Sequence, residues 1–249
     1  MLLKGRVAVI SGAASPRGIG LATARMFAAH GARVVILDLD EKASQAAAAS
    51  IGPEHLGFAC DVTSPESCRK AIERTIAATG VIDVLVNNAG ITQPVKFVDL
   101  TPEDWRRIMA VNLDGVFNLS QAVVPHMRAR RSGSIACMSS VSAQRGGGIF
   151  GGPHYSSAKA GVLGLAKAMA RELGAYNIRV NCVAPGLIQT DITGGKLTPE
   201  MKIEIRKGIP LDRLGDADDV AGAFLFLAAD ISSYLTGTVI DVNGGMHIH

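Results

Sequence analysis

The sequence predicts an α/β fold, a doubly wound parallel sheet of seven strands with helices on both faces. Short, β-branched apolar runs alternate with helical patterns from one end of the chain to the other. Most of these runs are apolar at consecutive positions, which is typical of strands buried on both faces. No shift in composition and no Pro/Ser-rich linker divides the 249 residues. We therefore expect a single domain over residues 1–249.

The expected strands cover residues 7–10, 34–37, 57–60, 84–86, 134–138, 180–184 and 239–242. The expected helices cover residues 20–29, 41–50, 65–79, 102–129, 156–175 and 216–228. Two of these helices have clear start signals, Ser64-Pro65-Glu66 and Thr101-Pro102-Glu103. Each signal combines a capping hydroxyl, a proline at the first helical position and an acid in the first turn.

One segment, residues 187–211, interrupts the alternation. It follows a strand, has no strand of its own, and contains Gly194-Gly195 and a capped helix start, Thr198-Pro199-Glu200. A long excursion at the carboxyl end of a strand is often a lid over a site. We expect a substrate lid here, and the alternative is a surface insertion with no role in binding.

The composition excludes several classes of protein. Apolar residues make up 48% of the chain and the mean hydropathy is +0.26, which excludes a disordered chain. The net charge is only +3. The densest basic cluster, Arg128, Arg130 and Arg131, fits a solvated helix end better than a nucleic-acid-binding stripe. We therefore expect no nucleic-acid partner.

The cysteines and the apolar stretches indicate in which cellular compartment the protein is expected. Cys60, Cys68, Cys137 and Cys182 lack the spacing of a metal site, so we expect free thiols in a reducing compartment and no metal. The longest apolar stretch, residues 220–229, is too short to span a bilayer, and no signal peptide is recognised. We expect a cytoplasmic protein with no membrane partner.

The first expected strand runs directly into a glycine-rich loop, residues 11–20, and a helix follows. Glycines let a backbone approach a pyrophosphate, and the free N–H groups of a helix start bind its charge. The order of strand, turn and helix is typical of a Rossmann-type dinucleotide site, and the alternative is a tight turn without a ligand. The expected cofactor contacts in this loop are Gly12, Ser15, Arg17, Gly18, Ile19 and Gly20.

Two residues give opposite indications of which dinucleotide binds. Asp38 ends the second strand, where a carboxylate can accept both ribose hydroxyls of an adenosine and would repel a 2′-phosphate. Arg17 is a loop guanidinium that could pair with a 2′-phosphate. Because a strand end is a fixed position and a loop arginine can swing away, we give Asp38 the greater weight. The sequence therefore favours NAD, with NADP as the alternative.

Further motifs follow the later strands. They are Asp61-Val62 after the third strand, Asn87-Asn88-Ala89-Gly90 after the fourth, Asn112 in a long helix, Ser140 after the fifth, Tyr155-Ser156-Ser157-Ala158-Lys159, and Pro185-Gly186 after the sixth. Together with the glycine loop, these motifs make the chain resemble the short-chain dehydrogenase/reductase family over essentially its whole length.

The resemblance implies roles for these positions. Asp61 and Val62 would contact the adenine, Asn88, Ala89 and Gly90 would line the dinucleotide groove beside Pro185 and Gly186, and Ile188 and Thr190 would hold the nicotinamide carboxamide. It also implies a homotetramer. The chain departs from the family pattern in two places, since Ser15-Pro16 lengthens the glycine loop and the interval from Ser140 to Tyr155 is longer than usual.

Tyr155 and Lys159 are the expected catalytic pair. They are four residues apart at the start of a helical pattern and therefore share one helix face. A free tyrosine has a pKa of about 10, and a nearby lysine cation favours the phenolate. The alternative is a solvated helix pair without a catalytic role. The accompanying groove and Ser140 favour catalysis, with Tyr155 as the acid or base.

Two more residues complete the expected catalytic set. Ser140 lies just past a buried strand, where its hydroxyl can donate to a substrate oxygen as charge develops there; Ser139 is the rival. Asn112 is a polar side chain among apolar neighbours, so it must find partners. The resemblance implies that Asn112 joins Lys159 to a chain of waters that replaces the transferred proton, and the alternative is a structural hydrogen bond.

The substrate is less defined. The candidate substrate residues are Ser140, Ser142, Gln93, Tyr155 and Leu187, together with residues 144–153 and the expected lid. The end of the chain, Val242-Asn243-Gly244-Gly245-Met246, resembles that of 3-oxoacyl-ACP reductases, which mostly use NADPH.

The sequence thus favours an oxidoreductase that transfers hydride between NAD(H) and a small-molecule secondary alcohol or ketone. The first alternative is an NADPH-dependent 3-oxoacyl-ACP or 3-oxoacyl-CoA reductase. A more distant alternative is a dinucleotide-sensing protein without turnover.

Overall fold

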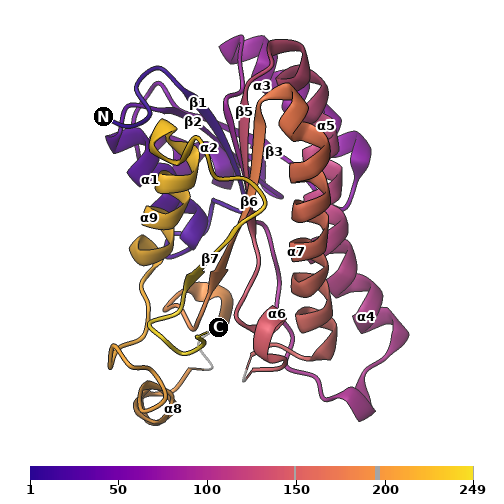
Figure 1. The fold of residues 1–249 in the computed structure, drawn as a ribbon, viewed down its shortest axis with the longest axis vertical. Helices are drawn as coiled ribbons and strands as arrows, with labels where there is room; N and C mark the ends of the chain where they lie inside the picture. Colours follow the sequence, from indigo (N-terminus) through magenta and orange to yellow (C-terminus); the bar gives the residue numbers. More distant parts are fainter. Residues whose placement is uncertain (149, 194–196, 249) are drawn as a thin grey trace.

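The computed structural model describes residues 1–148, 150–193 and 197–248 of the chain. Within them, seven parallel strands form one sheet in the order β3-β2-β1-β4-β5-β6-β7 (Figure 1). The strands are β1 Val7–Ser11, β2 Arg33–Asp38, β3 Leu56–Ala59, β4 Val84–Asn87, β5 Gly133–Met138, β6 Ile178–Pro185 and β7 Val239–Val242. The predicted doubly wound α/β fold is confirmed.

Helices cover both faces of the sheet (Figure 1). One face carries α1 Ile19–Ala29, α2 Glu41–Ala49 and α9 Ala217–Ala228, and the other carries α3 Pro65–Thr79, α5 Gly115–Arg130 and α7 Pro153–Leu173. Successive residues of β1 enter opposite cores: Val7 and Val9 pack under α3, α5 and α7, whereas Ala8 and Ile10 pack under α1 and α9. This two-sided burial is the reason that the strands are apolar at consecutive positions.

The predicted start signals act as caps. The Ser64 side chain accepts a hydrogen bond from the Ser67 N–H, and Thr101 accepts one from the Asp104 N–H. Pro65 and Pro102 lie at the first helical positions, where a missing N–H costs no hydrogen bond. The four cysteines are free and buried, as expected.

The long helix expected over residues 102–129 has an interruption. It consists of α4 Pro102–Met109, a π-helical turn Ala110–Asp114 and then α5. The turn contains Asn112, whose side-chain amide donates to the Ile108 carbonyl at 3.0 Å. Sequence periodicity did not separate these pieces, because the chain continues in helical form throughout.

The segment over residues 187–211 extends past the end of the sheet. It contains a 3₁₀ turn, Asp191–Thr193, and α8 Pro199–Arg206, which Thr198 caps through the Met201 N–H as the sequence predicts. Residues 194–196, which include the Gly194-Gly195 pair, lie outside the described residues. Ile188 forms an isolated parallel bridge with Gly215, so both ends of the segment are joined.

The remaining elements are short. They are α6 Ser142–Arg145 and the 3₁₀ turns Phe97–Asp99, Gly174–Tyr176 and Asp230–Ser232. No helix in the described part of the chain has the length and apolar character needed to cross a membrane.

Candidate active site

A cleft of about 1130 Å³ lies where the strands end. The expected site residues that line it are Gly12, Ser15, Gly18, Ile19, Asp38, Asp61, Val62, Asn88, Ala89, Gly90, Asn112, Ser140, Ser142, Tyr155, Lys159, Pro185, Gly186, Leu187, Ile188 and Thr190. Three expected residues, Arg17, Gly20 and Gln93, are not part of this lining. The structure thus brings the expected catalytic residues and nearly all expected cofactor contacts to one cavity.

The glycine loop packs directly on the loop after β4. Gly12 has a φ of +63°, and a Cβ there would lie 2.6 Å from the Ala89 Cα. A Cβ on Gly20 would lie 2.6 Å from the Gly12 carbonyl oxygen. The Asn88 amide donates to the carbonyls of Ser11 and Gly12, at 2.9 and 2.8 Å. Gly20 does not line the cleft, but its lack of a side chain allows the loop to pack closely at Gly12.

Asp38 is held in place by the backbone. One carboxylate oxygen accepts from the Ala14 N–H and the other from the Leu39 N–H, both at 2.9 Å. Because Asp38 also lines the cleft, its fixed negative charge faces the position that a ribose would take beyond β2. This arrangement fits the adenosine half of a dinucleotide.

Arg17 is bound to the 187–211 segment. Its Nε donates to Asp191 at 2.7 Å, and a terminal nitrogen lies 2.6 Å from the same carboxylate oxygen. The other Asp191 oxygen accepts from the Ser15 hydroxyl at 3.0 Å and from the Arg17 N–H at 3.3 Å. These hydrogen bonds hold the pKa of Asp191 below its usual value. The segment is therefore attached to the glycine loop through one carboxylate.

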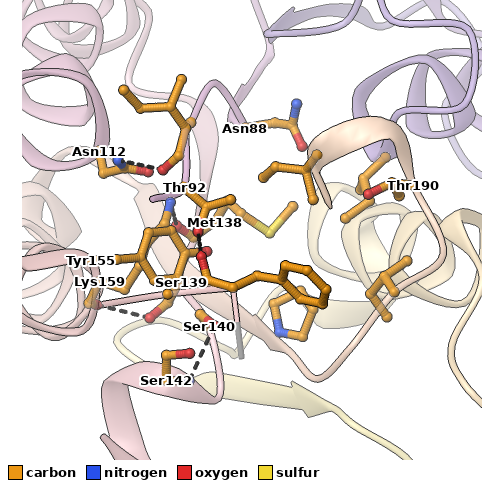
Figure 2. Close-up of a pocket in the computed structure, with 18 of the residues that line it drawn as sticks. Asn88, Thr92, Asn112, Met138, Ser139, Ser140, Ser142, Tyr155, Lys159 and Thr190 are labelled. Carbon is orange, nitrogen blue, oxygen red and sulfur yellow. Dashed lines mark hydrogen bonds between the residues drawn. The ribbon is translucent and has the colours of Figure 1, made fainter. Parts of the chain in front are cut away.

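Tyr155 lies in the first turn of α7 and points into the cleft beside Ser140 (Figure 2). Desolvation by burial raises the pKa of Tyr155, and a hydrogen bond with the Ser140 hydroxyl opposes that rise. Ser140 in turn accepts a hydrogen bond from the Ser142 N–H at 3.1 Å. The tyrosine is thus protonated at neutral pH in this structure, and its hydroxyl is paired with the serine that the sequence selected.

Lys159 differs from the expectation that it lowers the pKa of Tyr155. Its ammonium lies 5.8 Å from the Tyr155 ring centroid and donates to the Met138 carbonyl at 2.9 Å (Figure 2). Burial lowers the pKa of Lys159 itself to about 8. Lys159 as a whole residue is only 2% exposed, and the strand-end carbonyl compensates for part of the hydration that its ammonium loses.

Asn112 lies in the π turn with its amide directed to the Ile91 carbonyl at 2.9 Å (Figure 2). Its Oδ1 is buried and accepts no hydrogen bond within the described residues. A Cβ built on Gly90 would lie 2.8 Å from that oxygen and 3.4 Å from the Lys159 Nζ. Asn112 and Lys159 therefore face the same space above Gly90.

Gln93 and His154 belong to a second polar group behind the catalytic helix. The Gln93 carbonyl oxygen lies 3.2 Å from the His154 Nε2, and its amide donates to Asp104 at 2.7 Å. Burial lowers the pKa of His154, which favours its neutral form. The structure therefore places Gln93 as a link between α4 and the start of α7, away from the cavity wall.

Several residues shape the site through contacts that the sequence did not indicate. Ser139, the rival of Ser140, donates its hydroxyl to the Lys159 carbonyl at 2.9 Å and so ties β5 to α7. A Cβ on Gly151 would lie 2.7 Å from the Tyr155 ring, so only glycine fits there without a shift. Thr92 lines the cleft and donates to the Phe150 carbonyl. These residues have no local signal, because their partners lie on other elements.

The fold and this site are those of a dinucleotide-binding oxidoreductase, and the serine, tyrosine, lysine and asparagine expected to be catalytic gather at the carboxyl edge of its parallel sheet. A family model described as enoyl-(acyl carrier protein) reductase matches residues 12–247. The chain belongs to the short-chain dehydrogenase/reductase family, whose enzymes use a nicotinamide dinucleotide and act on alcohol and keto groups.

Individual relatives match over the full length. The chain is 66% identical over 253 residues to an uncharacterized short-chain type dehydrogenase/reductase, y4mP, of Sinorhizobium fredii, with 100% of each chain covered. It is 43% and 40% identical to the 3-oxoacyl-[acyl-carrier-protein] reductases FabG of Thermotoga maritima and Escherichia coli, again with 100% of each chain covered. The crystal structure of gox2181 superposes with a TM-score of 0.93 at 34% identity, over 98% of this chain and 96% of that one.

Proposed function

We propose that this enzyme uses NAD(H) and interconverts a small secondary alcohol and its ketone. The observation that carries the proposal is the pair of charges at the adenosine end of the cleft. Asp38 is fixed there by two backbone N–H groups, while Arg17, the cation that would favour a 2′-phosphate, is occupied by Asp191. The balance of charge at this end therefore opposes NADP.

The size of the effect follows from the charge pair. A phosphate charge about 4 Å from the Asp38 carboxylate would cost about 4 kcal/mol at the dielectric of a protein surface. That cost corresponds to a preference for NADH over NADPH of roughly a thousandfold. An exposed ion pair such as Arg17–Asp191 contributes only about 0–1 kcal/mol, so the expected preference depends on the fixed carboxylate of Asp38 rather than on the strength of this pair.

The catalytic side chains supply the proton chemistry. When bound, the nicotinamide would accept or supply the hydride. In the direction of reduction, the Tyr155 hydroxyl donates its proton to the ketone oxygen, and Ser140 donates a hydrogen bond to the same oxygen as negative charge develops there. In the oxidative direction, Tyr155 removes the proton of the alcohol. The hydrogen bond between Ser140 and Tyr155 supports this division of work, because it holds both hydroxyls at one point in the cleft.

Lys159 and Asn112 assist the proton transfer at Tyr155. The buried ammonium of Lys159 stabilises a developing phenolate and can bind a cofactor ribose hydroxyl. The buried Oδ1 of Asn112 and the Lys159 Nζ face one space above Gly90, which supports a water-mediated proton path between them. This path would restore the Tyr155 proton after each turnover.

A 3-oxoacyl thioester reductase that uses NADPH is the second candidate. It is favoured by the reductases of Thermotoga maritima and Escherichia coli, to which the chain is 43% and 40% identical. The negative charge of Asp38 opposes the binding of NADPH, the cofactor of this candidate.

We also propose that the protomer is a single domain in which residues 187–211 act as a lid. We propose further that a homotetramer buries the exposed side chains of Phe97, Val98 and Phe117.

The test is a fluorescence titration of the purified protein with NADH and with NADPH. We expect the dissociation constant for NADH to be at least 100-fold lower than that for NADPH. A preference for NADPH would overturn the NAD(H) assignment and make 3-oxoacyl thioesters the first substrates to assay.

A further inference from the structure

The charged residues that line the cleft within the described chain are Asp38, Asp61, Arg145, Lys159 and Asp191. Four of them have a role or partner already. Asp38 accepts from two backbone N–H groups, Asp61 accepts from the N–H and hydroxyl of Thr63, Asp191 binds Arg17, and Lys159 lies beneath Tyr155. Arg145 is the charge that the dinucleotide and the catalytic set do not use.

Arg145 is the last residue of α6, and its side chain is exposed at the substrate end of the cleft. One terminal nitrogen donates to the Met246 carbonyl at 3.0 Å. Within the described residues, no carboxylate forms an ion pair with it. A guanidinium has five N–H donors, so one contact to a carbonyl fixes its position and leaves most of its donors available.

The position of Arg145 is coupled to the reacting centre through α6. This helix begins at Ser142, whose N–H donates to the Ser140 hydroxyl, so a single helical turn joins the catalytic serine to the guanidinium. The two residues after Arg145, Gly146 and Gly147, have no side chains and positive φ values. No heavy atom lies within 4 Å of a Cβ built on either of them. The two residues after Arg145 therefore place no side chain over the cation, which is itself exposed.

Among the described side chains that line the cleft at this end, none carries a charge that competes with Arg145. Apolar lining residues here include Ile91, Phe150, Leu187, Ile192, Ile205 and Met246. Two carboxylates are neighbours of this group in the chain: Asp191 is held by the glycine loop, and Glu204 is paired with Lys207. An anion beside Arg145 would thus meet a positive charge flanked by apolar side chains and could form charge-assisted hydrogen bonds with it.

We propose that Arg145 is a specificity-determining residue that binds an anionic group of the substrate. This inference rests on the proposed dehydrogenase function and narrows its substrates to ketones and secondary alcohols that carry a carboxylate or a phosphate. A planar guanidinium matches both groups through paired N–H···O bonds. The anion could be part of a small oxo acid or of the carrier arm of an oxoacyl thioester, and the two sources can be separated by experiment.

The test compares matched substrates that differ in charge. Acetoacetate and ethyl acetoacetate present the same ketone with and without a carboxylate. Acetoacetyl-CoA and acetoacetyl-N-acetylcysteamine present the same thioester with and without phosphates. Steady-state reduction of all four would be measured for the wild type, Arg145→Gln and Arg145→Lys, with Arg69→Gln on α3 as a control that removes an exposed arginine elsewhere.

In Arg145→Gln, we expect kcat/KM for the charged member of one pair to fall by about 10- to 100-fold, mainly through KM. The neutral member should change less than about threefold, and Arg145→Lys should restore part of the loss. Arg69→Gln should leave both ratios unaltered. A response confined to acetoacetate identifies a small oxo acid, and one confined to acetoacetyl-CoA identifies a carrier arm.

Three outcomes would count against the proposal. If Arg145→Gln lowers the melting temperature but leaves both charge ratios unchanged, Arg145 is only a tie to Met246, and the proposed dehydrogenase function still stands. A wild type that prefers the neutral member of each pair would also overturn the inference. If the wild type binds NADH but reduces none of the four ketones, the proposed function fails together with the inference.

Discussion

The two ends of the cleft are built from different materials. The adenosine end consists of strand ends and backbone groups, with Asp38 fixed by two N–H donors and Gly12 pressed against Ala89. The substrate end consists of side chains from α6, the loop before α7 and the 187–211 segment, which meet only in the folded protein. Because backbone groups form the adenosine end, that end accepts one ligand geometry. Because side chains form the substrate end, single substitutions there can change which ligand binds.

Tyr155→Phe sharpens this comparison most strongly. Removing the proton donor should lower kcat by about 10³-fold or more, because general acid–base catalysis contributes about 10²–10⁴-fold. The dissociation constant for NADH should stay within about twofold, since the ring and its contacts remain. Single-turnover reduction and an NADH titration on the same sample would measure both. Turnover at the wild-type rate would contradict the assigned role of Tyr155.

Asp38→Asn tests the other end. Removing the charge while keeping a similar shape should reduce the preference for NADH over NADPH by about 10²–10³-fold, with little change in kcat for a saturated enzyme. Competition titrations with both dinucleotides would measure the shift. The melting temperature serves as the control, because the amide can accept only one of the two backbone hydrogen bonds that the carboxylate accepts. An unaltered preference would show that another group selects the cofactor.

Lys159 lies where the two ends of the cleft meet, and its burial should make the stability of the protein depend on pH. Its pKa is about 8 in the folded protein against 10.5 for the free side chain. Between these values the unfolded chain binds a proton that the folded protein has released, so stability should rise with pH across this window by up to about 3 kcal/mol.

Lys159→Met removes this dependence. Urea unfolding of both proteins at pH 7.5 and 10.5 would show the wild type gaining free energy of unfolding relative to the variant at the higher pH. An equal difference at both pH values would mean that the folded protein keeps the ammonium protonated throughout, in conflict with the burial seen here.

The same contrast explains what the sequence could and could not predict. The strands, the caps at Ser64 and Thr101, and the cofactor residues follow local rules, because each is a backbone geometry that nearby side chains determine. The structure also brings the four residues expected to be catalytic to one cleft. The contacts of Gln93 with His154 and Asp104 could not be predicted, since they join three elements that are separate in the chain.

The ion pair between Arg17 and Asp191 could not be predicted from the sequence either. Asp191 lies 174 residues after Arg17, and no periodicity links the two. The approach of Lys159 to Tyr155 was expected from their spacing, but the hydrogen bond of the ammonium to the Met138 carbonyl was not. Spacing predicts which side chains share a helix face, but burial decides where a long cation finds its hydrogen bond.

The π turn over Ala110–Asp114 holds one more residue than an α-helical turn of the same rotation would use. Deleting one residue here would let the turn close as an ordinary α-helical turn, and α5 would keep its orientation. The stripe of Leu119, Val123 and Met127 would then still face the sheet that it covers. A deletion inside α5 itself would instead rotate the residues after it by about 100°, so the chain tolerates a change of length at the π turn better than one turn later.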